Sequence, residues 1–154
     1  MENKYFIPDI SDIRIGYEYE EYHPVWTSEG IDESFWVHKV FKEPLMYGTT
    51  ISDKIDLRHI RVPFLTKEQI ENERWELAEV LEEDDDGNDM FSTGFEKYIN
   101  EDNWYSFVKK EDNKIIIYKS WYRNSVVRLT RVLFYGKCRC INDFRLIMKM
   151  LNIK

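Results

Sequence analysis

The sequence predicts a single α+β domain over residues 1–154, in which a strongly twisted, mostly antiparallel sheet is combined with a short mid-chain helix and a packed C-terminal helix. Residues 104–136 contain three runs rich in aromatic and β-branched residues, the composition of β-strands. From Asp143, apolar residues recur at the i, i+3, i+4, i+7 spacing of one helix face. They are Phe144, Ile147, Met148 and Leu151. This face must be buried, and the strands before it are its expected partner.

The three strands are expected at residues 104–109, 114–120 and 126–136. Residues 110–113 (KEDN) form a polar turn of the kind that joins antiparallel neighbours. The helix that follows has a recognisable start, because Asn142 is a favourable N-cap and Asp143 would face the positive end of the helix dipole. The residues at the positions of a hydrophobic staple are Ile141 and Leu146.

The N-terminal part predicts two further strands. Residues 12–22 alternate between apolar and polar side chains, which indicates a half-exposed strand with an acidic outer side, and Gly16 within it suggests a bulge or a close neighbour. Residues 23–33 are expected to be a loop. Residues 34–41 are apolar on both faces, which favours a central strand. Residues 43–50 are expected to be a turn region.

A short helix is predicted in the middle of the chain. Residues 60–64 are extended, and Pro63 within them indicates an edge or a strand end. The helix then starts at Thr66 with a capping box and a hydrophobic staple, and we expect it to break near Arg74. The capping-box residues are Thr66 and Gln69, and the staple residues are Leu65 and Ile70.

After this break, residues 75–81 are expected to be extended, and the acidic run 82–89 (EEDDDGND) to be a solvated loop between two strands. The spacing of Phe91, Phe95 and Tyr98 is typical of a helix.

The net charge of −7 is distributed unevenly. Residues 104–154 carry twelve basic and three acidic residues, a net charge of +9, whereas residues 1–103 carry ten basic and 26 acidic residues, a net charge of −16. Such a split indicates an interaction surface, an acidic shield, or two halves that pair with each other within one fold.

Composition favours a cytoplasmic protein. No apolar run approaches the ~20 residues that a membrane-spanning helix needs, and the N-terminus lacks the pattern of a signal peptide. Two cysteines, Cys138 and Cys140, are too few for a disulfide scaffold.

No catalytic, metal or cofactor motif is recognisable, so we expect a non-enzymatic protein without a cofactor. The acidic loop fails as a calcium-binding loop, because counting from Asp84 places Asp89 at position six and Phe95 at position twelve. The two cysteines lack the C-x₂₋₄-C spacing of a zinc site. Nucleophile motifs and phosphate-binding loops are also missing from the sequence.

The segment 120–125, which links two predicted strands, is the candidate binding site. Trp, Tyr and Arg are enriched in binding hot spots, and aromatic residues interleaved with basic ones can also stack on nucleotides. Alternatively, the aromatic residues cap the core and the arginines pair with acidic residues. The candidate partner-binding residues are Trp121, Tyr122, Arg123, Lys119, Arg128 and Arg131.

Two blocks of the sequence, IRVPFLTKEQIENERW and FYGKCRCINDFRLIMKMLNI, carry a resemblance. In this order, after the N-terminal strands DIRIGYEYE and FWVHKVF, they resemble uncharacterised small proteins of phages that infect Bacteroidota, including crAss-like phages. The chain departs from that pattern at Arg74, where the pattern usually has glycine. The resemblance implies a phage product that acts inside an infected bacterium, and it supplies no activity.

These observations lead to an expected function. We expect a phage accessory factor that binds or inhibits a host protein, and we also consider binding to another phage protein. One alternative is nucleic-acid or nucleotide binding through the basic C-terminal sheet. Another is a minor virion or assembly component.

Overall fold

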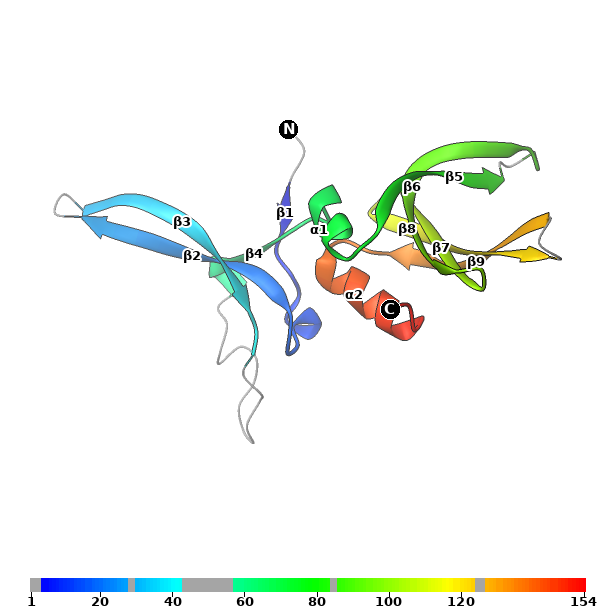
Figure 1. Ribbon diagram of the computed structural model, residues 1–154. Coiled ribbons are helices and arrows are strands. Elements are labelled where there is room, and N and C mark those ends of the chain that lie inside the picture. The colour runs from blue at the N-terminus through cyan, green and yellow to red at the C-terminus, as the bar shows by residue number, and fades with distance from the viewer. Residues whose placement is uncertain (1–3, 28–29, 43–56, 84–85, 124–126) are drawn as a thin grey trace. The chain divides into compact units, whose positions relative to one another are not determined.

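The computed structural model describes residues 4–27, 30–42, 57–83, 86–123 and 127–154 (Figure 1). The chain divides into two compact units, Met1–Phe64 and Leu65–Lys154. Each unit contains one antiparallel sheet, and the second unit also contains both α-helices, which confirms the predicted α+β class. The strands form two sheets, of four and five strands, where one sheet was predicted.

The first unit holds a sheet with the strand order β1-β4-β2-β3. Its strands are β1 (Tyr5–Phe6), β2 (Glu18–Thr27), β3 (Gly30–Val40) and β4 (Ile60–Pro63), with 3₁₀ helices at Ile10–Asp12 and Leu57–His59. The end of β4 at Pro63 confirms that this proline closes a strand. The predicted turn at residues 43–50 lies outside the described residues.

The strand predicted at residues 12–22 starts only at Glu18, because the chain before it makes a turn. Gly16 has φ +90 and its N–H donates to the carbonyl oxygen of Phe41 at 2.7 Å. Alternation predicts that Ile13 and Ile15 share one face, but in the turn that contains this left-handed Gly16, Ile13 is buried and Ile15 is 63% exposed. Alternation alone therefore placed the start of the strand too early.

The loop predicted at residues 23–33 is wrong, since β2 and β3 form one long hairpin across most of this segment. Pro24 is paired opposite Ser34 within the hairpin. It fits there because the pairing of β2 with β4 involves only Glu20 and Glu21, so β3 is the one neighbour of β2 at Pro24 in the described part of the sheet.

The prediction that residues 34–41 form a central strand is also wrong, because β3 lies at the edge of the sheet. One face of β3 carries Trp36, and a cation–π contact explains why this aromatic side chain is tolerated at the edge of the sheet. The guanidinium carbon of Arg61 lies 4.2 Å from the ring centroid of Trp36 and 3.6 Å from that of Tyr5. Arg61 also pairs with Glu20 at 2.8 Å. An aromatic side chain on an edge strand is thus covered by a long basic one.

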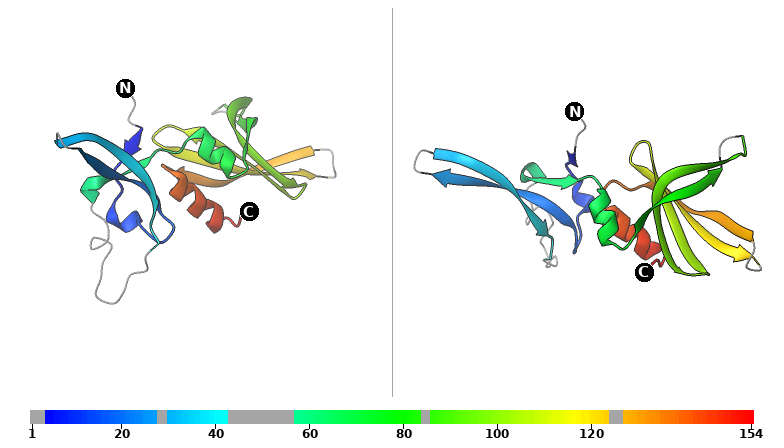
Figure 2. Two further views of the ribbon diagram at one scale, coloured as in Figure 1. Left: turned by 60° about the vertical axis from the view of Figure 1, so that its left-hand side comes forward. Right: turned by 45° about the horizontal axis from the view of Figure 1, so that its top comes forward.

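The second unit holds a five-stranded antiparallel meander with the order β5-β6-β7-β8-β9. Its elements are α1 (Lys67–Asn72), β5 (Glu76–Glu83), β6 (Asp89–Asn100), β7 (Asn103–Lys110), β8 (Lys114–Arg123), β9 (Val127–Lys137) and α2 (Ile141–Met150). The three predicted C-terminal strands and the turn between the first two are confirmed, and the two turn residues Asp112 and Asn113 both have positive φ. Figure 2 shows how strongly these strands bend along their length.

The predicted start of α1 is confirmed in full. The hydroxyl of Thr66 accepts from the backbone N–H of Gln69, whose side chain accepts in return from the backbone N–H of Thr66. The staple residues Leu65 and Ile70 are both buried. The chain leaves the helix through Arg74, which adopts φ 69, a conformation that favours glycine.

The predicted start of α2 is wrong by two residues, because the helix begins at Ile141 with Cys140 as its N-cap. Asn142 is buried in the first turn, and with Cys140 as the N-cap, Ile141 and Leu146 no longer occupy the staple positions; Leu146 is 41% exposed. Asp143 lies in the first turn of α2, which confirms its predicted place at the positive end of the helix dipole, and it also accepts a hydrogen bond from the backbone N–H of Arg139 at 2.9 Å. The predicted apolar face is confirmed, with Phe144, Ile147 and Met148 buried and Leu151 packed against the core.

The helix-like spacing at Phe91, Phe95 and Tyr98 misled the prediction, because these residues belong to β6. Only Phe95 is buried, whereas Phe91 and Tyr98 are 68% and 58% exposed. The predicted loop at 82–89 is shorter than expected, since Glu82 and Glu83 end β5 and Asp89 begins β6.

The core of the second unit lies between the sheet and α2. Trp75, which follows α1, contacts Phe107 of β7 and Phe144 of α2 with ring centroids 5.1 and 5.9 Å apart. Phe95 stacks on Phe107 at 5.1 Å. The hydrophobic side chains of β6, β7 and β8 that join this cluster therefore share one face of the sheet.

Candidate binding surface

Strand alternation gives the five-stranded sheet two faces. The helix face carries Phe95, Phe107 and Ile117, which are paired across β6, β7 and β8 and are buried with α2. The opposite face carries Ser106 and Tyr118, which are also paired. We call this second side the inner face.

The sheet curls around its inner face. Glu82 of β5 accepts hydrogen bonds from the Tyr118 hydroxyl of β8 at 2.8 Å and from Nζ of Lys110 of β7 at 3.1 Å. In the sheet, β6 and β7 lie between β5 and β8. Neighbouring strands are about 4.8 Å apart, so a flat sheet would hold β5 and β8 about 14 Å apart. The sheet must therefore bend until the end of β5 lies over β7 and β8.

Gly94 of β6 makes this bend sterically possible. A Cβ atom at this position would lie 2.3 Å from the carbonyl oxygen of Phe107 and 2.9 Å from Cγ2 of Val80. Glycine is thus required at the point where backbone and side chains of β5, β6 and β7 approach most closely.

Glu82 is the central polar group of the inner face, with 5% of its surface exposed. Burial alone raises the pKa of its carboxyl group, but hydrogen bonds from Ser92, Lys110 and Tyr118 and the charge of Lys110 outweigh burial and lower the pKa below its usual value. The same arrangement raises the pKa of the Tyr118 hydroxyl, first through burial and then through its bond to Glu82. Glu82 is therefore an ionised carboxylate with several donors, and Tyr118 is a neutral phenol.

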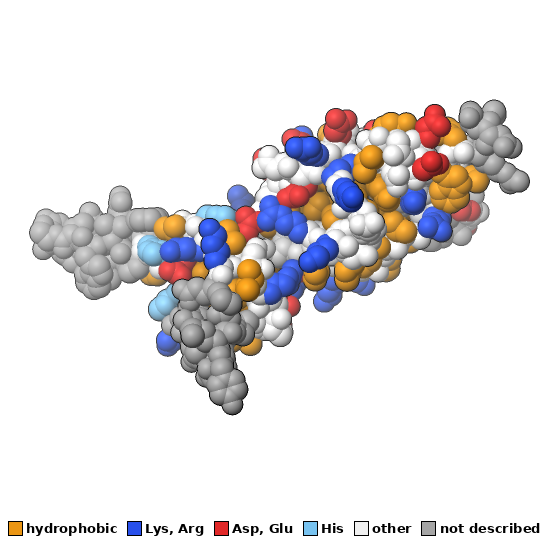
Figure 3. All heavy atoms as spheres, turned by 60° about the horizontal axis from the view of Figure 1, so that its bottom comes forward, with side chains coloured by type: hydrophobic (Ala, Val, Ile, Leu, Met, Phe, Trp, Pro, Cys, Tyr) orange, Lys and Arg blue, Asp and Glu red, His pale blue; other side chains and the backbone are white. Residues whose placement is uncertain are grey.

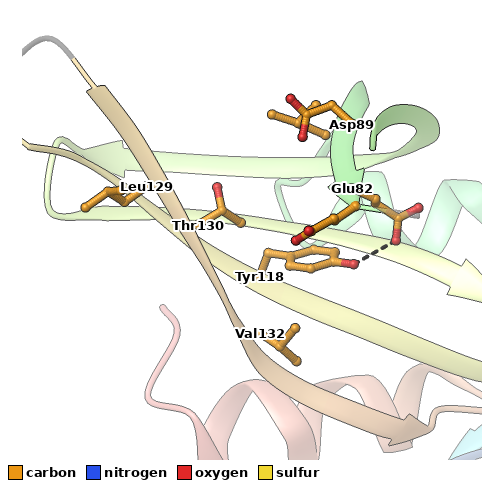
Figure 4. A pocket seen from close by; sticks show the side chains of 8 residues that line it. Glu82, Asp89, Tyr118, Leu129, Thr130 and Val132 are labelled. Carbon is orange, nitrogen blue, oxygen red and sulfur yellow. Dashed lines mark hydrogen bonds between the residues drawn. The ribbon is translucent and has the colours of Figure 1, made fainter. Parts of the chain in front are cut away.

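A cavity of about 420 Å³ lies beside this group, between β5 and β9, the two edge strands of the sheet. Figure 4 shows the Tyr118 hydroxyl directed toward the Glu82 carboxylate, and Leu129, Thr130 and Val132 along β9. The residues that line the cavity are Leu81, Glu82, Glu83, Asp89, Tyr118, Leu129, Thr130 and Val132. One part of the wall is apolar and the other carries carboxylates.

Three aromatic rings form a row across the inner face. Trp104 of β7 contacts Tyr98 of β6 edge-on and stacks on Tyr122 of β8, with both pairs of ring centroids 5.9 Å apart. Tyr98 and Tyr122 are 58% and 45% exposed. Nε1 of Trp104 donates to Glu96 at 3.3 Å, which holds the central indole in place. We call Tyr98, Trp104 and Tyr122 the aromatic row.

The row and the cavity are linked through the buried Ser120, which lies on the inner face between them. Ser120 is paired with Trp104 on one side and with Thr130 on the other, and the hydroxyls of Ser120 and Thr130 are 3.1 Å apart. Thr130 is also part of the cavity wall. In the face seen in Figure 3, hydrophobic side chains reach the surface of the second unit among basic and acidic ones.

The structure separates the six predicted binding residues. Alternation along β8 places Tyr122 on the inner face and Lys119 and Trp121 on the helix face, where Arg131 of β9 is paired with Lys119. The guanidinium of Arg131 lies 5.9 Å from the ring centroid of Trp121. The side chains of Arg123 and Arg128 lie outside the described residues.

Most of the inner face is not predictable from the sequence. The local patterns predict a helix at Tyr98, a strand at Trp104 and a solvated loop at Glu82, and none of them indicates a binding surface. Alternation in residues 104–109 does predict that Trp104 lies on the other face of the strand from Tyr105 and Phe107, which are buried. This was the one sequence signal that pointed to the inner face.

Cys138 and Cys140 are buried free thiols. Burial raises the pKa of both, which suppresses the thiolate form. Among the described residues, no three His, Cys, Asp or Glu side chains are grouped so that they could hold a metal ion. Within the same ranges, no helix has the length and apolar character needed to cross a membrane.

Comparison of the chain with protein-family models, curated proteins and solved structures gave no match.

Proposed function

We propose that this chain is a non-enzymatic binding protein that recognises a protein partner through the aromatic row of its inner face. The observation that carries the proposal is the contact of three large rings from three adjacent strands, of which Tyr98 and Tyr122 are half exposed. Tyr and Trp are the side chains most often found at the centre of protein interfaces. Their rings have few rotatable bonds, so little conformational entropy is lost on binding.

A protein partner fits this surface better than a nucleic acid does. Glu96 is hydrogen-bonded to the central indole, and Glu101 and Asp102 occupy the turn between Tyr98 and Trp104. The basic residues Lys119 and Arg131 lie on the opposite face. A phosphate backbone that followed the aromatic row would therefore meet carboxylates.

The resemblance to phage proteins supports a more specific form of the proposal. We infer that the chain is a phage accessory factor that acts in the cytoplasm of an infected bacterium and that its partner is a host protein, which it binds or inhibits. An acidic protein can occupy a basic site on such a partner.

Nucleic-acid or nucleotide binding is the second candidate, and a separate cluster favours it. Trp121 and Arg131 are in cation–π contact on the helix face, and Nζ of Lys119 lies 5.8 Å from the ring centroid of Tyr105. Aromatic rings beside cations are a common arrangement for stacking bases near phosphates.

A pull-down of the tagged chain from bacterial lysate, with and without nuclease at two salt concentrations, distinguishes the two candidates. The proposal expects a discrete host protein that survives nuclease and is lost with Tyr98→Ala and Tyr122→Ala. Phe91→Ala is the matched control, because Phe91 is an exposed ring of β6 on the helix face. Capture of nucleic acid that is lost with Trp121→Ala and Arg131→Ala would favour the second candidate. Equal loss of the host protein with Phe91→Ala would contradict the proposal.

A further inference from the structure

We propose that the cavity between β5 and β9 accepts a lysine or arginine side chain of the protein partner. This inference rests on the proposed function and names the chemical group that the partner presents beside the aromatic row. The occupant follows from the charge of the cavity, from its mixed lining and from its position near the row.

The charge of the cavity selects a cation. Glu82 is already neutralised, since Nζ of Lys110 lies 2.9 Å from its Oε1. Glu83 and Asp89 also line the cavity, and both are exposed. Within the described ranges, neither of these two carboxylates takes part in an ion pair. Among the described side chains, the cavity therefore presents two carboxylates that have no ion-pair partner, and this favours a cation over an anion.

The lining also matches a long basic side chain. Leu81, Leu129 and Val132 provide an apolar wall, and the carboxylates of Glu83 and Asp89 provide a polar one. Lysine and arginine have this same division, because an apolar stem carries a charged head. The volume of about 420 Å³ is large enough to hold one lysine or arginine side chain.

The cavity lies close enough to the aromatic row for one partner to contact both. Thr130 of the cavity wall is paired with Ser120, and Ser120 is paired in turn with Trp104 of the row. A partner that covers Tyr122 with an apolar or aromatic group would therefore have its neighbouring residues close to the cavity. The row would supply buried apolar area, and the cavity would select the charge of the adjacent side chain.

The test is an NMR titration of the full chain with N-acetyl-arginine methylamide, which needs no knowledge of the partner. N-acetyl-citrulline methylamide is the control probe, because it has nearly the same shape and no charge. We expect the arginine probe to shift the backbone amide signals of residues 81–83, 89, 118 and 129–132. The citrulline probe should shift them much less, and added salt should weaken the arginine effect.

Two variants link the shifts to the carboxylates. Glu83→Gln and Asp89→Asn should each lower the affinity of the chain for the arginine probe by about 1.5- to 5-fold, the range expected for the loss of one exposed ion pair. Glu79→Gln, an exposed carboxylate of the same strand outside the cavity, should leave the affinity unchanged. Equal shifts with citrulline, or shifts outside the cavity only, would overturn the inference.

The captured partner separates this inference from the proposed function. If the host protein is lost with Tyr122→Ala but retained at full affinity by the Glu83→Gln, Asp89→Asn double variant, the aromatic row is the binding site and the cavity inference is wrong. If the arginine probe binds in the cavity while Tyr98→Ala and Tyr122→Ala retain the host protein, the cavity inference stands and the role of the row is wrong.

Discussion

The hydroxyl of Tyr118 on β8 donates to the carboxylate of Glu82 on β5 at 2.8 Å, although two strands separate β5 from β8 in the sheet. This bond joins one edge strand to a strand at the other side of a curled meander. Removing it tests whether the curl is maintained by the polar cluster.

Tyr118→Phe should therefore destabilise the chain. The variant removes a hydrogen bond to a buried charged group, and such bonds are worth about 1.5–3 kcal/mol. Urea unfolding followed by circular dichroism measures the loss. Tyr135→Phe is the control, because Tyr135 is 58% exposed and its free energy of unfolding should change by less than about 0.5 kcal/mol. Equal effects of the two variants would show that the Tyr118 bond does not support the curl.

The contribution of Glu82 should depend on pH. The pKa of Glu82 is lowered in the folded chain, so the folded state favours the carboxylate more than the unfolded state does. The stabilisation is then fully present above the unfolded pKa of about 4.5 and is lost as the pH falls through the folded pKa. The difference in free energy of unfolding between the wild type and Glu82→Gln should therefore be larger at about pH 7 than at about pH 3. A difference that grows on acidification would contradict the sign of the shift.

Gly94→Ala should destabilise the second unit strongly. The added Cβ would lie 2.3 Å from a backbone oxygen, which cannot move without shifting β7. Overpacking of this kind costs about 2 kcal/mol or more. Gly136→Ala is the matched control, since the nearest atom there is a ring carbon of the partly buried Phe134 at 2.9 Å, and a side chain can shift more easily than a backbone oxygen. Thermal unfolding should show a larger decrease in Tm for Gly94→Ala, and the reverse order would contradict the steric explanation.

Arg74→Gly should stabilise the chain by about 1 kcal/mol, because Arg74 has φ 69 and glycine adopts this conformation without strain. Burial is the main cause that lowers the pKa of Lys97, and the charge of Arg74 lowers it further, so removing Arg74 also relieves a repulsion. Arg74→Ala removes the same charge and keeps the backbone strain. If urea unfolding shows the same gain for both variants, the effect comes from charge and not from conformation.

Cys138 and Cys140 should resist thiol reagents in the folded chain. Both side chains are buried, and burial raises the pKa of each thiol, so little thiolate forms near neutral pH. Labelling with a chromogenic disulfide reagent should be slow in buffer and should reach two thiols per chain in denaturant. Rapid labelling of the folded chain would show that the segment before α2 opens easily.

Features that depend on residues a few positions apart could be predicted from the sequence. The capping box and staple of α1, the turn at residues 110–113 and the apolar face of α2 each arise within one or two turns of chain, so spacing was sufficient to predict them. The alternation in residues 104–109 likewise predicted a strand. Where a positive φ interrupts alternation, as at Gly16, or where a short pattern fits two periods, as in Phe91 to Tyr98, local spacing was ambiguous.

Which side chains meet depends on how the strands pair and bend. Tyr98, Trp104 and Tyr122 come from three strands, and only the register of β6, β7 and β8 brings their rings together. Glu82 belongs to an acidic run that is typical of a solvated loop, yet the curl of the sheet buries it against Lys110 and Tyr118. Register and curl depend on contacts between strands far apart in the chain, such as the close approach of Gly94 to Phe107, and no local pattern contains them.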